Sequence, residues 1–207
     1  MRKQIDITFE ISMIGIIHAL FSYIQFEYLS IFNNTPQMAV FFIPAAVRVF
    51  SVIIFGYLAG FGIALGVLIH DLYLHPLPHS LAEILFSVSQ QGIAVSVSLL
   101  IWAMLSNKVS CLLKPQIDFK SINAFDVLQM CCIQALVNST TAHIFYMSSP
   151  SINMNFDWYN FAVMFVGDLT GAFFVFIIAN IMFSLLKRTR FFPHKHYDDT
   201  MNSKWRR

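Results

Sequence analysis

The feature that most constrains this chain is a series of long apolar runs separated by short polar segments. A helix needs roughly 20 residues to cross a hydrocarbon core about 30 Å thick, and most of the runs approach or exceed that length. They cover about 7–31, 39–57, 58–74, 81–105, 123–147 and 157–186. We therefore expect an all-α, polytopic integral membrane protein, with about six transmembrane helices in one bundle over residues 1–186.

Composition argues against a soluble domain. Of the 207 residues, 57% are hydrophobic and only 12% are charged, whereas a soluble domain carries about 25% charged residues. A soluble fold would have too few charges for its surface. The lipid bilayer is therefore the first partner that we expect for this chain.

The stretch from 39 to 74 is too long for one straight transmembrane helix. Gly56, Gly60 and Gly62 lie near its centre, and glycine weakens a helix and favours turns. We predict two short helices joined by a tight turn around Gly56–Gly60. One crossing followed by a re-entrant segment is the alternative, and the sequence leaves it open.

The distribution of basic residues predicts the orientation. Lys and Arg flank the apolar runs at the N-terminus, in the 106–122 loop and after residue 186, whereas the 32–38, 75–80 and 148–156 loops contain none. The positive-inside rule places the basic segments in the cytoplasm, which requires six crossings. We expect a multi-pass protein of the cell inner membrane with both termini cytoplasmic.

Residues 187–207 form a basic tail that we expect to be cytoplasmic. No recognition helix or aromatic platform accompanies these charges, so we expect no nucleic-acid partner. Anionic lipid headgroups or a partner protein are the binding surfaces that such a tail suits. The cations that we assign to this contact are Lys187, Arg188, Arg190, Lys195, Lys204, Arg206 and Arg207.

Ionisable residues inside the apolar runs require an explanation, because Arg or Asp at the centre of a transmembrane helix costs about 2.5–3.5 kcal/mol. Arg48 and Asp168 each lie near the middle of a run, at a depth close to the bilayer midplane. A salt bridge that fixes helix register and a buried site for a small anion or proton both fit this pattern. Four more polar residues reach similar depth on other runs, namely His18, Gln90, Gln91 and Asn138.

A second group of polar residues clusters towards the predicted outer ends of the helices. Imidazole and carboxylate groups bind zinc, nickel or copper, although the spacing only loosely matches metal-ligand spacing. A polar loop that responds to pH is the alternative. The residues of this possible metal site are His70, Asp71, His75, His79, Glu83 and His143.

No catalytic or cofactor motif is visible. The chain lacks a Ser/His/Asp set, an HExxH motif, a P-loop and a Rossmann glycine pattern, so we expect neither enzymatic activity nor a cofactor. Three glycine pairs have the small-x3-small spacing of closely packed transmembrane helices: Gly56 and Gly60, Gly62 and Gly66, Gly167 and Gly171. This spacing predicts close packing of the second, third and sixth helices or, alternatively, a homo-oligomer.

Several short motifs resemble the first membrane-associated sensor domain family. They are the segment Phe-Phe-Ile-Pro-Ala-Ala at 41–46, the Gly56 turn with the Gly62 and Gly66 pair, and Gly-Asp-Leu-Thr-Gly at 167–171 in the last span. Domains of that family are bacterial integral membrane sensors that precede diguanylate cyclases and histidine kinases. The resemblance implies a stand-alone sensor-like protein, without an output domain, that senses a small ligand or membrane state and signals through a cytoplasmic or membrane protein partner.

Two other functions remain open from the sequence. Six helices in about 200 residues also suit the substrate-binding membrane subunit of a vitamin-type transporter. A membrane anchor subunit of a cytoplasmic complex is the third possibility. Neither the ligand nor the partner is identifiable from these residues.

Overall fold

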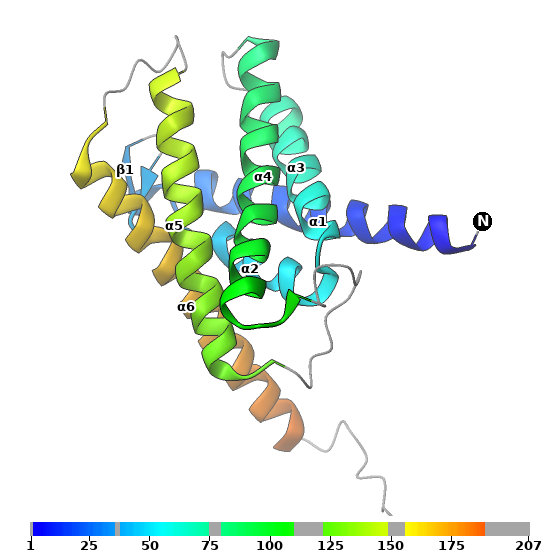
Figure 1. The fold of residues 1–207 in the computed structure, drawn as a ribbon. Helices are drawn as coiled ribbons and strands as arrows, with labels where there is room; N and C mark the ends of the chain where they lie inside the picture. Colours follow the sequence, from blue (N-terminus) through cyan, green and yellow to red (C-terminus); the bar gives the residue numbers. More distant parts are fainter. Residues whose placement is uncertain (1, 36–37, 75–79, 110–121, 149–155, 189–207) are drawn as a thin grey trace, which may run out of the picture. The chain divides into compact units, whose positions relative to one another are not determined.

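A computed structural model describes residues 2–35, 38–74, 80–109, 122–148 and 156–188. Within these ranges the chain forms six α-helices, α1 (Arg2–Tyr28), α2 (Pro44–Phe55), α3 (Leu58–Ile69), α4 (Leu81–Leu105), α5 (Ala124–Ser148) and α6 (Trp158–Arg188) (Figure 1). The shorter elements are a 3₁₀ turn η1 (Ser30–Phe32), strands β1 (Asn33–Thr35) and β2 (Met38–Ala39), and a π-helical turn η2 (His70–Leu74). The two strands pair antiparallel. The described chain is thus helical, as predicted.

The chain divides into two compact units, and the boundary lies within α6. The first unit covers residues 1–175, and the second begins at Phe176. Every contact described below belongs to the first unit.

The predicted start of the second helix is wrong. We expected a helix from residue 39, but α2 begins at Pro44, and the strand β2 and an irregular segment of bends and a turn precede it. Proline has no N–H and is favoured in the first turn of a helix, where that donor is not needed. The remaining helices begin or end within a few residues of their predicted bounds, and α4 matches exactly the range 81–105.

The predicted break between the second and third helices occurs at Gly56 rather than across Gly56–Gly60. Gly56 has a φ of 53° and ends α2, in the left-handed region that glycine adopts without a steric penalty. Gly60 lies within α3, where a Cβ would collide with Ser96 of α4. One glycine therefore makes the turn, and the other allows two helices to pack closely.

Helix α3 packs between α1 and α4 at glycine residues, which have no side chain. A Cβ on Gly62 would collide with Ile14 of α1, and Gly92 of α4 lies against the backbone of Gly60. Close approach of helix backbones through small residues is typical of membrane bundles. The predicted small-residue packing is present, but its partners are α1 and α4.

The interior of the first unit contains polar as well as apolar side chains, and many large apolar side chains lie on its surface. Three helices in the described part of the chain are long and apolar enough to cross a membrane, namely Asp6–Tyr28, Leu81–Leu105 and Trp158–Ile181. Large apolar side chains are exposed along the long helices, for example Ile16, Leu20, Leu85, Ile93, Leu136 and Ile144. In water such a surface would be unfavourable, whereas a hydrocarbon solvent suits it.

Candidate functional site

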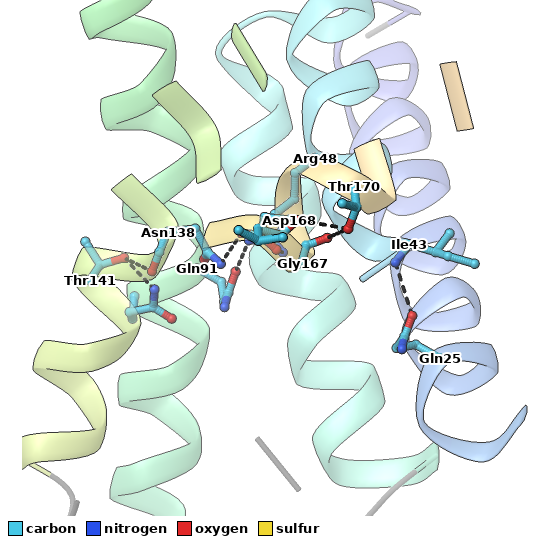
Figure 2. Close-up of polar contacts among 11 residues, drawn as sticks. Gln25, Ile43, Arg48, Gln91, Asn138, Thr141, Gly167, Asp168 and Thr170 are labelled. Carbon is cyan, nitrogen blue, oxygen red and sulfur yellow. Dashed lines mark hydrogen bonds and ion pairs between the residues drawn. The ribbon is translucent and has the colours of Figure 1, made fainter. Parts of the chain in front are cut away.

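The centre of the first unit contains an ion pair between α2 and α6. Arg48 Nη2 lies 3.1 Å from Asp168 Oδ1, and the two side chains are only 1% and 5% exposed. Figure 2 shows the pair in the middle of a row of polar contacts. The salt bridge that the sequence predicted is therefore present.

Amide side chains from two further helices extend the ion pair. Asn138 of α5 donates from Nδ2 to the second carboxylate oxygen of Asp168 at 2.8 Å. Arg48 donates from Nη1 to Oε1 of Gln91 on α4 at 3.4 Å. Both oxygens of Asp168 therefore accept a donor, and both terminal nitrogens of Arg48 have an acceptor. Side chains from α2, α4, α5 and α6 meet in this layer (Figure 2).

The non-helical segment before α2, residues 39–43, is held against α6 by its backbone. Phe42 N donates to Gly167 O at 3.0 Å, and Thr170 Oγ1 donates to Val40 O at 2.9 Å. A Cβ on Gly167 or Gly171 would collide with carbonyl oxygens of this segment. The glycines beside Asp168 therefore allow the chain to approach α6 directly, which brings Arg48 to the level of its partner.

Helix α1 completes this attachment through Gln25, which the sequence reasoning missed. Gln25 is fully buried, and its Oε1 accepts a hydrogen bond from Ile43 N at 3.1 Å (Figure 2). Its Nε2 donates to Asn33 Oδ1 at 3.4 Å. The sequence does contain a signal for Gln25, because it is an amide in an otherwise apolar run. Its position near the end of that run gave no indication that it is buried.

Two predicted members of the layer lie outside the ion-pair network. Gln90 donates from Nε2 to Oγ1 of Thr141 at 2.6 Å and so connects α4 to α5. His18 is buried on α1 beside Gly66 of α3, and its Nδ1 has no hydrogen-bond partner among the described residues. Neither side chain bonds to Arg48 or Asp168 in the described contacts.

Helix α5 carries buried polar groups that the sequence reasoning also missed. Gln134 is 1% exposed, and neither its Nε2 nor its Oε1 has a hydrogen-bond partner in the described part of the chain. Three more buried atoms have no hydrogen-bond partner among the described residues: Asn138 Oδ1, Arg48 Nε and Ser139 Oγ. Gln134 precedes Asn138 by one helical turn and so lies on the same face of α5. This four-residue spacing from Asn138 is the feature of the sequence from which a buried Gln134 could have been predicted.

Buried polar atoms without partners are uncommon in folded proteins. Leaving one such group unsatisfied costs about 1–3 kcal/mol. Among the described residues, two such atoms, Arg48 Nε and Asn138 Oδ1, belong to side chains of the ion-pair network. The guanidinium carbon of Arg48 also lies 5.2 Å from the ring centroid of Phe42.

The second predicted cluster does not form a metal site in the described part of the chain. No group of three or more His, Cys, Asp or Glu side chains there has an arrangement that holds a metal ion. His70 contacts Asp71 at 2.9 Å within η2, Glu83 forms a capping box with Ser80 at the start of α4, and His143 is buried on α5. His75 and His79 lie outside the described residues.

Most of the basic tail also lies outside the described residues. Lys187 and Arg188 fall in the last turn of α6, and the structure describes their backbone only. Positions 189–207 are not described.

Comparison with known proteins gives no relative. No protein-family model matches the chain, no curated protein matches it, and no solved structure matches it.

The geometry predicts strong energetic coupling between Arg48 and Asp168. Replacing either residue with alanine leaves the other charge buried, so Arg48→Ala and Asp168→Ala should each lower the free energy of unfolding by about 3–5 kcal/mol. The double variant should lose far less than the sum. The measurement is a double-mutant cycle. It compares the free energy of unfolding in mixed detergent of the wild type, the two single variants and the double variant.

The exposed carboxylate of Asp6 on α1 provides the control. Asp6→Ala should change stability little and should add to Arg48→Ala without coupling. Additive effects of Arg48→Ala and Asp168→Ala would show that the pair makes no net contribution to the fold.

Proposed function

We propose that this chain is a multi-pass membrane sensor that binds a small ligand in the buried polar layer and signals through a partner protein. The observation that carries the proposal is the buried Arg48–Asp168 pair, together with Arg48 Nε and Asn138 Oδ1, which have no hydrogen-bond partner among the described residues. Ionisable residues at membrane depth usually mark functional sites. The resemblance of residues 41–46 and 167–171 to the membrane sensor family supports the same function.

The proposal includes six crossings, of which the second is discontinuous. Helix α2 has 12 residues and is about 18 Å long, too short for a hydrocarbon core of about 30 Å. The segment 39–43 that precedes α2 is not helical, and we propose that it completes the second crossing together with α2. Irregular backbone at membrane depth requires partners within the protein. Gly167, Thr170 and Gln25 supply such partners.

A substrate-binding subunit of a transporter is the second candidate. The observation that favours it is the same discontinuous segment, because transporter substrate sites lie near the midplane beside interrupted helices. The two candidates share a ligand site and differ in the partner. A sensor associates with a signalling protein, whereas a transporter subunit associates with an ATPase module.

The proposed topology predicts the accessibility of five single-cysteine positions, with the native cysteines replaced by serine. An impermeant maleimide added outside intact cells should label Thr35→Cys, Pro78→Cys and Ser149→Cys. Lys114→Cys and Ser203→Cys should react only after permeabilisation, because the basic segments are proposed to be cytoplasmic. Labelling at position 78 is decisive, since one crossing plus a re-entrant segment would place it inside.

Partner association tests the function itself. We expect deletion of residues 191–207 to leave membrane insertion and thermal stability unchanged and to abolish retention of the cytoplasmic partner. The measurement is affinity purification of the full chain and of the truncated chain, with mass spectrometry of the protein and small-molecule fractions.

The matched control replaces the tail with a sequence of equal length in which each Lys and Arg is Gln, which separates loss of charge from loss of length. A bound small molecule in both preparations, with a signalling partner only in the full chain, supports the sensor. An ATPase as the partner supports the transporter subunit. Partner retention after truncation would contradict the assignment of the tail.

A further inference from the structure

We infer that the polar layer binds an uncharged, amide-like molecule, one that carries both a carbonyl oxygen and an N–H group. This inference rests on the proposed function, because it names the ligand class of the same site. It follows from which atoms of the layer already have partners and which do not.

The charged groups of the layer already bond to one another. Asp168 accepts from Arg48 on one oxygen and from Asn138 on the other, and the terminal nitrogens of Arg48 bond to Asp168 and Gln91. The pair has no net charge. A lone anion or cation entering this layer would create a buried net charge without a counter-ion, which costs several kcal/mol per ion.

The buried atoms that lack a hydrogen-bond partner among the described residues include both donors and acceptors. Arg48 Nε and Gln134 Nε2 are donors, whereas Gln134 Oε1 and Asn138 Oδ1 are acceptors. An anion would satisfy only the donors, and a cation only the acceptors. An uncharged amide offers a carbonyl oxygen and an N–H, and it can pair reciprocally with the carboxamide of Gln134.

The helix spacing and the hydrogen bonds connect these groups to one another. Asn138 bonds directly to the carboxylate that pairs with Arg48. Gln134 lies one turn away on the same face of α5, about 6 Å along the helix axis. All three side chains are at most 3% exposed. Ser139 is adjacent to Asn138 in sequence but lies about 100° round the helix, so it belongs to a different face.

Three probes of nearly identical shape test the ligand class. Acetamide, acetate and acetamidinium are respectively uncharged, anionic and cationic, and glycine provides a zwitterion. We expect acetamide to raise the unfolding midpoint of the full chain in detergent in a saturable manner, at constant ionic strength. Its apparent affinity should exceed those of the other three by at least tenfold.

Two variants on α5 locate the effect. Gln134→Leu should abolish the acetamide response while leaving the unliganded protein at least as stable as the wild type, because it removes two unsatisfied polar atoms. Ser139→Ala should keep the full response. The comparison among probes on the wild-type chain remains valid even if Gln134→Leu does not fold.

The outcomes separate this inference from the proposed function. A response to acetate, acetamidinium or glycine as strong as that to acetamide would overturn the ligand class and leave the sensor proposal in place. An absence of any response, or an acetamide response that survives Gln134→Leu, would overturn the inference. Failure of the sensor proposal is read separately, from partner retention in the affinity purification.

Discussion

The ion pair between Arg48 and Asp168 is the interaction on which the rest of the first unit depends. It joins α2 to α6 at 3.1 Å in a setting where both side chains are almost fully buried. Either charge alone would be unfavourable in so buried a position. The short helix α2 can therefore lie inside the bundle only if α6 presents a carboxylate at the matching level. Asn138 and Gln91 complete the pair from α5 and α4.

The backbone contacts around the pair explain why the motif at 167–171 contains two glycines. Asp168 pairs with Arg48 only if the segment before α2 approaches α6 closely, and any Cβ at Gly167 or Gly171 would block that approach. Thr170 and Gln25 then satisfy backbone groups that a continuous helix would have satisfied itself. Charge, glycine spacing and interrupted helix thus form one arrangement. It brings together polar side chains from four helices, α2, α4, α5 and α6.

Much of this arrangement could be predicted from the sequence, because its physical causes are local. The long apolar runs specified the helices, and Arg48 and Asp168 stood out as charges at equal depth in those runs. The non-helical segment 39–43 could not be predicted, since its apolar side chains fit a helix and its conformation depends on contacts with Gln25, Gly167 and Thr170, which lie elsewhere in the sequence. Gln25 and Gln134 were missed for a related reason. Amides are less costly than charges in an apolar run, and their importance depends on which neighbours the fold brings to them.

The most direct test of this account is a solid-state NMR measurement of dipolar coupling in lipid bilayers. The coupling is measured between the ¹⁵N-labelled guanidinium groups of Arg and the ¹³Cγ atoms of Asp in the full chain. The account predicts a strong short-range contact, consistent with the 3.1 Å separation of Nη2 and Oδ1, that disappears in Arg48→Lys and in Asp168→Asn. A bilayer spectrum without this contact, or one in which the contact survives both substitutions, would contradict the central claim.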